Sequence, residues 1–449
     1  MIGKYPSYQD SNVIWFGEIP SHWNMYPIKH LFSERNERNK DGNTNYLSIV
    51  KDKGVILYSE KGNVGNKTSD RPENYKMVYV NDIVINSMNI TIGSVGKSIH
   101  NGCLSSVYIV LNPNDSIDSS YYDYIFSHKS FQKSLKRISY GIMEIRESLN
   151  KIEFYVEQLP FPPLPEQTQI VSFLDNKTQK IDELIEKTEQ KIKLLKEKRT
   201  SLINHCVTKG LNPTVEMKDS GVEWIEEIPS HWDFIPTKYF TIHKNGIQTG
   251  PFGTQLNTKD YVDNGVKVMN QKTLIDEDYD TGEEFISYEK YEDLKVFEVL
   301  EGDMIMGTRG SFGKGKRTTF GKVSIVPKGL GDCVLHPCLI RIRLKENLIL
   351  KNYYYFYIND STFFLEDIRN TSNSTTIEVI YGITLKDIKI PVPPLKEQQQ
   401  ILKYINEQTQ KIDSTIEKET QRTELLKEYR QSLISEVVTG KVDVRDYNG

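Results

Sequence analysis

Two glycine-rich segments place a lysine where it could meet a phosphate group. They are GSVGK at residues 93–97 and GSFGK at residues 310–314, and each follows a short strand-like run that begins with aspartate. Glycine allows a backbone to approach a ligand closely, and a lysine beside such a turn offers a positive charge to a phosphate oxygen. We therefore expect Lys97 and Lys314 to contact a phosphate backbone.

These segments do not have the pattern of a nucleotide-hydrolysing P-loop. In the pattern G-x-x-x-x-G-K-[ST], the first glycine falls at Thr91 in one segment and at Thr308 in the other, and only the first segment continues to a serine, Ser98. Nucleotide hydrolysis is therefore not expected.

Signatures of other enzymes are not found in the sequence. The two Pro-Pro pairs stand in FPPL (161–164) and VPPL (392–395), without the polar residue with which amino-methyltransferases hold an exocyclic amine. Glu216 and Lys218 have the Glu-X-Lys spacing of some nucleases, but no acidic partner precedes them, so a solvated surface explains them better. The alternative of a DNA methyltransferase or nuclease with its own active site is therefore not favoured.

The four cysteines do not have the spacing of a zinc site. Cys333 and Cys338 flank His336, but no second pair of ligands lies at a suitable distance along the chain. We expect Cys103, Cys206 and this pair to be buried thiols, and we expect no metal.

Composition limits the class of protein. The chain of 449 residues has 37% hydrophobic and 26% charged residues, which is typical of globular domains, and its length fits two or three of them. A net charge of -4 excludes a uniformly basic coat, so contact with nucleic acid must use a local patch. No stretch resembles a signal peptide or a membrane span, which favours a cytoplasmic protein without membrane contact.

A segment of 50 residues occurs twice and should form a long helix. Residues 159–208 return as residues 390–439, with 27 of the 50 aligned positions identical. Each copy opens with a proline cluster and then contains neither glycine nor proline. We therefore expect an extended segment followed by a helix that begins near Glu166 in one copy and near Glu397 in the other.

Within each copy, apolar residues recur at alternating steps of four and three, which is the spacing of a coiled-coil seam. Such a helix is too long, and too polar outside its seam, for burial in one globular core, so the two copies should pack on each other. A coiled-coil adaptor without DNA affinity remains an alternative explanation of this feature. The seam residues are Leu174, Ile181, Ile185, Ile192, Leu195, Leu202, Ile405, Ile412, Ile416, Leu426, Leu433 and Val437.

A second repeat frames two regions that differ from each other. SNVIWFGEIPSHWNMYPIKHLF (11–32) returns as SGVEWIEEIPSHWDFIPTKYFT (220–241), with EIPSHW intact in both. The order is EIPSHW, a variable region and a long helix, and then the same again, so joining the two ends would give a near-symmetric ring. The predicted parts are a first domain with its frame segment (1–158), a long helix (159–210), a linker with the second frame segment (211–232), a second domain (233–389) and a second long helix with a tail (390–449).

EIPSHW, the PPL-EQ helix entry, the TQKID helix and the linker GLNPTVEMKDSGVEWIEEIP (210–229) together resemble the specificity subunit of Type I restriction-modification systems, over essentially the full chain. The resemblance implies an α+β protein with two mixed α/β target-recognition domains, two long antiparallel coiled-coil helices that separate them, and a pseudo-twofold internal repeat. It implies a non-catalytic subunit that recognises double-stranded DNA and acts as a scaffold, with one domain for each half of a split target.

The resemblance also implies partners. Two adenine-methylating subunits would dock on the helices, and restriction subunits with motor and nuclease activity would be added outside them. S-adenosylmethionine, ATP and Mg are expected on those partners, and no cofactor is expected in this chain. Two DNA readers held by a rigid spacer fit two half-sites about one helical turn apart, so the helices would set the gap between them.

Charge is divided sharply within the second domain. Residues 276–303 contain 12 acidic and 2 basic residues, whereas residues 304–345 contain 9 basic and 1 acidic. This boundary predicts one face that avoids DNA and another that binds it. Lys322 and Lys328 also fit an ordinary solvated surface.

Arg309 stands beside the second glycine-rich turn, where its guanidinium could offer two donors to a guanine edge. Asparagine can bond an adenine edge at two atoms, but it is also common in turns. The predicted DNA-binding residues are Asn86, Ser87, Asn89, Ser94 and Lys97 in the first domain and Arg309, Ser311, Lys314, Lys316 and Arg317 in the second.

Overall fold

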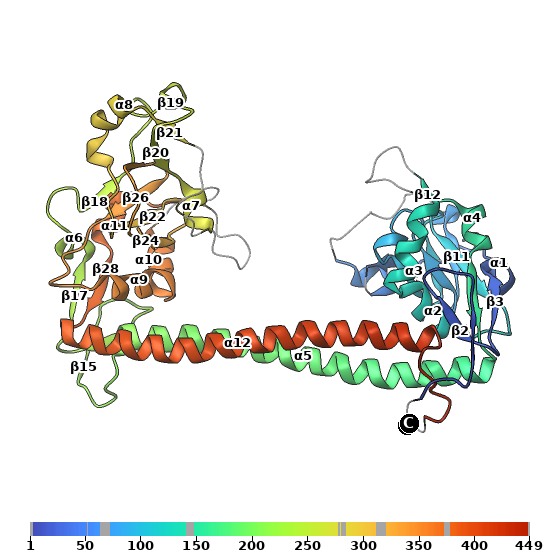
Figure 1. Cartoon of the computed structure of the whole chain (residues 1–449). Helices are drawn as coiled ribbons and strands as arrows, with labels where there is room; N and C mark the ends of the chain where they lie inside the picture. Colours follow the sequence, from blue (N-terminus) through green and yellow to red (C-terminus); the bar gives the residue numbers. More distant parts are fainter. Residues whose placement is uncertain are drawn as a thin grey trace. The chain divides into compact units, whose positions relative to one another are not determined.

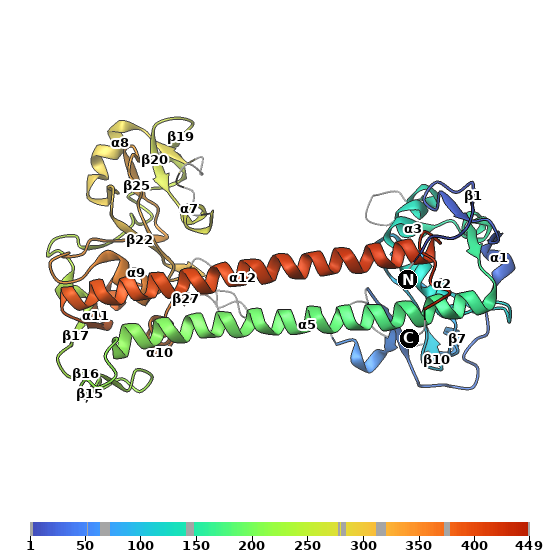
Figure 2. The ribbon, with the colours of Figure 1, turned by 60° about the horizontal axis from the view of Figure 1, so that its bottom comes forward.

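The computed structural model describes residues 3–51, 53–62, 72–140, 148–276, 279, 284–310, 320–371 and 378–447. The chain divides into two compact units. The first unit is Met1–Glu189 with Thr420–Gly449, and the second unit is Gln190–Glu419. Each unit combines a mixed α/β domain with part of each of two long helices (Figures 1 and 2). The predicted α+β class with an internal repeat is confirmed.

The two long helices are α5, which runs from Leu164 to Lys209, and α12, which runs from Leu395 to Val438. Both begin at the end of a proline cluster, two residues before the glutamates that the sequence favoured. They are antiparallel: Asp182 of α5 pairs with Arg430 of α12 in the first unit, and Arg199 of α5 pairs with Asp413 of α12 in the second.

The face on which the two helices meet follows the predicted spacing. Each of the twelve seam residues is buried or half-buried, and none is exposed. Thr178, Thr188 and Thr409 lie on the same face, and each donates its hydroxyl to the carbonyl oxygen four residues earlier, at 2.7, 2.7 and 2.8 Å. These bonds satisfy the threonine hydroxyls within the apolar contact between α5 and α12, without a partner from the other helix.

In the first unit, a four-stranded antiparallel sheet packs through two short helices on the helix pair. Tyr121 lies in α2 (Ser119–Ser127), and its hydroxyl donates to the carbonyl oxygen of Val438 at 3.0 Å, which ties α2 to the C-terminal end of α12. The sheet has the order β4 (Phe32–Glu34), β11 (Ile109–Pro113), β8 (Ile83–Ile85) and β9 (Val95–Lys97), beside β5 (Leu47–Val50), β6 (Gly54–Leu57), β7 (Lys76–Val78), β10 (Gly102–Leu104), β12 (Ser139–Tyr140) and β13 (Ser148–Leu149), with the helices α2 (Ser119–Ser127), α3 (Lys129–Ser134) and α4 (Lys151–Val156).

The second unit repeats this sheet and has a second four-stranded sheet. Figure 1 shows α9 (Lys351–Asn359) and α10 (Phe363–Thr371) on the side of the unit toward the long helices, and the second sheet with α8 (Tyr288–Asp293) at the far end of the unit. The repeated sheet has the order β18 (Ile247–Thr249), β26 (Leu339–Ile342), β22 (Met304–Gly307) and β24 (Val323–Ile325), and the second sheet has the order β19 (Tyr261–Val262), β21 (Phe285–Ile286), β20 (Val266–Met269) and β25 (Cys333–Leu335).

Strand register corrects one part of the sequence comparison. Ile83 at the start of β8 pairs with Lys97, and Met304 at the start of β22 pairs with Ile325. The counterpart of β9 is therefore β24. The last three residues of the first GSxGK segment form β9, whereas the second segment begins at Gly310, well before β24, and otherwise lies outside the described residues. The loop after the aspartate-led strand is longer in the second unit, so the shared motif does not mark equivalent positions of the two sheets.

The repeated frame joins each domain to the helices. Trp23 of the first EIPSHW segment is fully buried and donates its indole N–H to Glu166 Oε1 at 3.0 Å, and His22 Nε2 lies 2.8 Å from Glu166 Oε2. In the second unit, His231 Nε2 lies 2.9 Å from Glu397 Oε2. A carboxylate is favourable in the first turn of a helix, so each glutamate stabilises its helix and fixes the frame at the same time.

Matching two-stranded ribbons complete the frame. In each unit, one ribbon pairs the strand after EIPSHW with the strand that leads directly into a long helix. The start of each domain is therefore hydrogen-bonded to the segment that begins a helix. The ribbons are β1 (Tyr8–Asp10) with β2 (Glu18–Pro20) and β3 (Asn24–Pro27) with β14 (Gln158–Phe161), and β15 (Met217–Asp219) with β16 (Glu227–Pro229) and β17 (Asp233–Pro236) with β28 (Lys389–Val392).

Candidate nucleic-acid interface

An aspartate immediately before each of the strands β8 and β22 is held in place by an arginine. The carboxylate of Asp82 accepts two hydrogen bonds from the guanidinium of Arg35, at 2.8 and 3.0 Å, and that of Asp303 accepts two from Arg343, at 2.7 and 2.8 Å. Both aspartates are buried. Paired and hydrogen-bonded ions of this kind hold a fixed geometry. The loops at the opposite ends of β8 and β22 therefore leave from firmly held strands.

In the first unit, the loop after β8 is closed by its own backbone. The N–H of Asn86 donates to the carbonyl oxygen of Ser94 at 3.0 Å, and Oδ1 of Asn86 accepts the N–H of Met88 at 3.1 Å. Ser94 is buried and Ser87 is half-buried, whereas Met88 and Asn89 are exposed. Of the predicted contacts in this loop, Asn89 has the most accessible side chain, and Asn86 uses its acceptor within the turn.

Lys97 has a structural partner. Its ammonium donates to Ser120 Oγ at 2.6 Å, and its backbone N–H donates to Asp123 Oδ1 at 2.8 Å. These bonds tie β9 to α2. Contact between Lys97 and a phosphate stays a prediction.

In the second unit, Arg309 lies in the short strand β23 (Arg309–Gly310), which pairs with β27 (Glu378–Val379). Its side chain is exposed, and its carbonyl oxygen accepts a hydrogen bond from Gln271 Nε2 at 2.9 Å. Gln271 begins α7 (Gln271–Asp276). Ser311, Lys314, Lys316 and Arg317 lie outside the described residues.

Arg309 and Met88 occupy matching places. The carbonyl oxygen of Thr308 accepts the N–H of Ile380 at 2.9 Å, and in the first unit the carbonyl oxygen of Ser87 accepts the N–H of Leu149 at 3.0 Å. The residue that follows each carbonyl is a cation in one unit and a thioether in the other. The same backbone position thus presents a donor for hydrogen bonds in the second unit and an apolar group in the first.

Sequence reasoning missed a set of polar residues beside Arg309. β20 and β25 are parallel neighbours, and Asn270 and His336 follow them directly. Asn270 Nδ2 lies 3.0 Å from Glu284 Oε2, and the N–H of His336 donates to the carbonyl oxygen of Met269 at 2.9 Å. A polar residue after a buried β-strand was the available signal, but no local pattern indicated that these two strands are parallel neighbours.

The described residues offer few groups for redox or metal chemistry. Cys103, Cys206 and Cys333 are buried and Cys338 is half-buried, all as free thiols. Burial raises the pKa of Cys103 and Cys206 to about 11 and that of Cys333 to about 12, which makes these thiols poor nucleophiles. Within the described ranges, no group of three His, Cys, Asp or Glu side chains could hold a metal ion, and no helix is long and apolar enough to cross a membrane.

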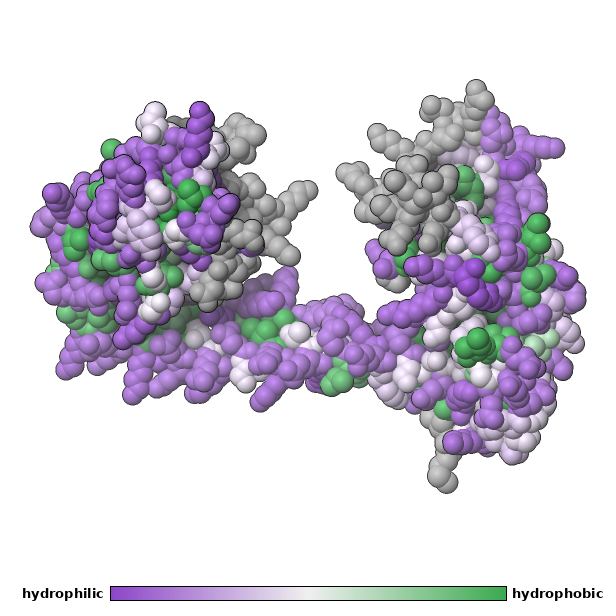
Figure 3. Space-filling view, turned by 45° about the horizontal axis from the view of Figure 1, so that its top comes forward, coloured by the Kyte–Doolittle hydropathy of each residue, from purple (hydrophilic) through white to green (hydrophobic). Residues whose placement is uncertain are grey.

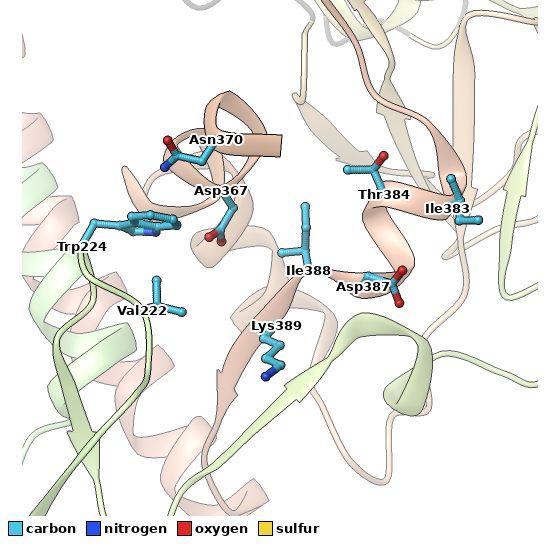
Figure 4. Close-up of a pocket in the computed structure, with 9 residues that line it drawn as sticks. All are labelled: Val222, Trp224, Asp367, Asn370, Ile383, Thr384, Asp387, Ile388 and Lys389. Atoms are coloured by element: carbon cyan, nitrogen blue, oxygen red, sulfur yellow. The ribbon is translucent and has the colours of Figure 1, made fainter. Parts of the chain in front are cut away.

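A cavity of about 500 Å³ lies elsewhere in the second unit. Figure 4 shows Trp224 and Asp367 next to each other at one side of it. Burial raises the pKa of Asp367 to about 7. None of the predicted DNA-binding residues that the structure describes lines this cavity, which is formed by Val222, Trp224, Asp367, Asn370, Ile383, Thr384, Asp387, Ile388 and Lys389.

Known proteins are similar to this chain in both sequence and fold. A model of the Type I restriction modification DNA specificity domain matches residues 20–194 and 247–428. The chain is 26% identical over 361 residues to the Type I restriction enzyme MjaVIII specificity subunit of Methanocaldococcus jannaschii, covering 77% of this chain and 76% of that one. It is 24% identical over 448 residues to the putative type I restriction enzyme MjaX specificity subunit of the same organism, covering 96% of each.

Two solved structures have the same fold. One is a chain solved in a study of complex assembly and conformational transition of the type I R-M system, with a TM-score of 0.70 and 14% identity. The other is the HsdS subunit from Thermoanaerobacter tengcongensis, with a TM-score of 0.54 and 14% identity. Each comparison covers 94% of this chain and 98% of the other.

Proposed function

The chain belongs to the Type I restriction-modification DNA specificity family, and from that premise we propose that it binds a bipartite target in double-stranded DNA, with one recognition domain for each half-site. The observation that carries the proposal is the match between Met88 and Arg309. A repeated backbone keeps the position, and the side chain changes from apolar to cationic. Two domains built in this way would accept different base sequences in the same manner.

Within a half-site, the contacts divide by chemistry. Arg309 has a planar guanidinium that suits the N7 and O6 acceptors of guanine. Lys314 and Lys316 are flexible point charges and suit the phosphate backbone. Contacts to bases would set the sequence, and contacts to phosphate would set most of the affinity and its dependence on salt.

The helix pair acts as a scaffold for two methylating subunits, with restriction subunits added outside them. In support, α5 and α12 each carry an exposed leucine at a repeated position: Leu194 is 63% exposed and Leu425 is 64% exposed. Figure 3 shows apolar side chains at intervals along the otherwise hydrophilic helices. Because the same exposed leucine occurs on both helices, we expect two copies of the methylating subunit to bind, one at each leucine.

The chain itself takes no part in the chemistry. S-adenosylmethionine, ATP and Mg would bind the partner subunits, where methyl transfer and DNA cleavage take place. The purified chain should therefore neither methylate nor cleave DNA, and methylation should begin when the methylating subunit is added.

Mapping methylated adenines in DNA from cells that carry this chain and its methylating subunits tests the proposal. The expected pattern is two short fixed sequences separated by a gap of constant length. A single uninterrupted site, or methylation that does not depend on this chain, would contradict the proposal. Binding to duplex DNA that weakens as salt rises would separate a DNA-recognition subunit from a coiled-coil adaptor without DNA affinity.

A further inference from the structure

The parallel strands β20 and β25 bring two polar residues to one edge of the second unit. Met269 is in register with Leu335, so Asn270 and His336 leave the sheet side by side. Both are half-buried. Side chains at the carboxyl edge of parallel strands commonly form binding sites, because the strands hold them while the following loops leave room for a ligand.

The strand that carries Arg309 passes beside this edge. The N–H and the hydroxyl of Thr308 both donate to the carbonyl oxygen of Cys338, at 3.0 and 2.9 Å. Gln271 Nε2 donates to the carbonyl oxygen of Arg309 at 2.9 Å. The charge of Arg309 also contributes to a lowered pKa at His336, after the larger effect of burial. The guanidinium therefore lies within electrostatic reach of the imidazole.

Most polar atoms at this edge already have a structural role. Asn270 donates from Nδ2 to Glu284 and accepts the N–H of Lys272 at Oδ1, at 3.0 Å in both cases. The hydroxyl of Thr308 is turned toward Cys338, as described above. Asn270 and Thr308 therefore hold the loops in place and are poor candidates for contact with a base.

His336 differs, because one bond fixes its tautomer. Its Nδ1 accepts the backbone N–H of Cys338 at 3.1 Å. Burial lowers the pKa of His336, and the charge of Glu284 only partly opposes this, so the imidazole is neutral near pH 7. A neutral imidazole that accepts at Nδ1 carries its proton on Nε2. His336 is then a donor at one atom, held in a fixed direction.

We infer that His336 donates from Nε2 to the N7 acceptor of a purine in the half-site bound by the second unit, beside the base that Arg309 contacts. In the major groove, guanine and adenine both present an acceptor at N7, whereas cytosine presents an amino donor. If the base were cytosine, the Nε2–H donor of His336 would face the amino donor of the base, and the contact would be repulsive. The inference rests on the proposed function, since it assumes that the second unit binds DNA.

The first unit has a different side chain at this place. The N–H of Leu339 donates to the carbonyl oxygen of His336 at 3.0 Å, and the N–H of Tyr108 donates to that of Ser105 at 3.2 Å. Ser105 is thus the counterpart of His336. A serine hydroxyl can donate and accept, so it does not impose the same choice of base. The purine preference should belong to one half-site only.

Two substitutions separate the donor from the acceptor of the imidazole. His336→Asn places Oδ1 where Nδ1 stood, which keeps the bond from Cys338 and removes the outer donor. His336→Gln places an amide N–H near the position of Nε2 and keeps that donor. His243→Ala is the matched control, because His243 is an exposed histidine of the same unit.

The experiment measures binding of the complex of this chain with its methylating subunits to duplexes that vary one half-site position at a time. We expect His336→Asn to reduce discrimination between purine and cytosine at one position of the second half-site by roughly 5- to 150-fold, the range of one good base contact. His336→Gln should keep most of the preference, and His243→Ala should keep all of it.

Three results would overturn the inference. They are an unchanged purine preference in His336→Asn, an equal loss in the Asn and Gln variants at all positions, and a change in the first half-site. A wild-type complex that shows no bipartite target would instead overturn the proposed function. The two failures are therefore distinguishable, because only the second appears without any substitution.

Discussion

Asp182 and Arg430 form a two-bond ion pair between α5 and α12, and the second unit repeats it with the helices exchanged. Arg430 donates to the carboxylate of Asp182 at 2.8 and 3.1 Å. Arg199 donates to that of Asp413 at 3.0 and 3.2 Å. In the duplicated sequence, Asp413 is the counterpart of Asp182 and Arg430 is the counterpart of Arg199. Antiparallel packing of two copies of one helix therefore pairs the same two positions twice, although Arg199 donates to Asp413 from Nε alone and also donates from Nη1 to Asp360 at 2.9 Å.

These two ion pairs favour one packing register of the helices over others. A seam of apolar residues at alternating steps of three and four also permits a slip by one heptad. Exposed ion pairs contribute little to stability, typically about 0 to 1 kcal/mol. Their value here is specificity, because a slipped register would separate Asp182 from Arg430 and Asp413 from Arg199 together.

Exchanging the charges of one pair tests this role. Asp182→Arg places two cations together and should lower the free energy of unfolding by about 1 kcal/mol or less, and Arg430→Asp should act similarly. The double exchange should regain most of the loss in a double-mutant cycle followed by urea unfolding. Lys180→Glu, at an exposed position of the same helix, is the control. Additive losses in the double variant would show that the two residues do not interact.

The helices were predictable from sequence because their signals are local. A proline cluster ends an extended segment, an interval without glycine or proline permits one helix, and the seam residues repeat over several turns. The packing partner also followed, since residues 159–208 return as residues 390–439. The exchanged ion pairs needed the antiparallel register, which comes from contacts between distant parts of the chain.

The candidate interface was less predictable because it depends on strand pairing. Arg309 could be named from its place beside a glycine-rich turn. His336 could not, because the neighbourhood of β20 and β25 joins residues far apart in the sequence. Lys97 shows a different limit of sequence analysis. Its motif suited contact with phosphate, but nothing in the sequence indicated that its ammonium donates a hydrogen bond to Ser120. A motif gives the type of side chain, and the fold decides which way it faces.

A network around Glu34 should make stability depend on pH in the acidic range. Burial raises the pKa of Glu34, but hydrogen bonds from Lys151 and Lys76 outweigh this and lower the pKa to about 2. Because the pKa in the folded protein lies below the ordinary glutamate value of 4.5, the ionised form stabilises the fold above pH 4.5, and this stability is lost as the pH falls toward 2. Unfolding midpoints measured across this range should fall for the wild type.

Glu34→Gln is the control for that pH dependence. The variant should be less stable at neutral pH, and it should lose less stability between pH 4.5 and pH 2 than the wild type. Equal slopes in the two proteins would exclude Glu34 as a source of the acid sensitivity.

Arg309→Ala and Met88→Ala should affect different half-sites. Loss of a two-donor contact to guanine should cost about 1 to 3 kcal/mol and relax one position of the half-site bound by the second unit. Met88→Ala should weaken selection in the other half-site only. Lys314→Ala should weaken binding to all sequences and reduce its salt dependence. Methylation maps in which Arg309→Ala changes both half-sites, or neither, would remove Arg309 from the base-contacting set.

Leu194→Glu and Leu425→Glu should each remove one methylating subunit. A charge in an apolar contact is costly, so each variant should lose the partner that covers that leucine and keep the other. Native mass spectrometry should give two subunits for the wild type, one for each single variant and none for the double. Lys193→Glu, next to Leu194, is the control for a change of charge alone. Full occupancy in both single variants would place the docking contact elsewhere.

Lengthening both helices tests whether they set the gap between half-sites. Four residues inserted between Glu189 and Gln190 of α5, and four between Glu419 and Thr420 of α12, leave each compact unit intact. The insertions lengthen each helix by about 6 Å, which corresponds to about two base pairs at about 3.4 Å each. The mapped target should keep both half-sites and gain up to about two base pairs between them. Four glycine and serine residues inserted after Leu211, in the linker beyond α5, are the control and should leave the gap unchanged. If the helix insertions also leave the gap unchanged while methylation persists, α5 and α12 do not determine the spacing.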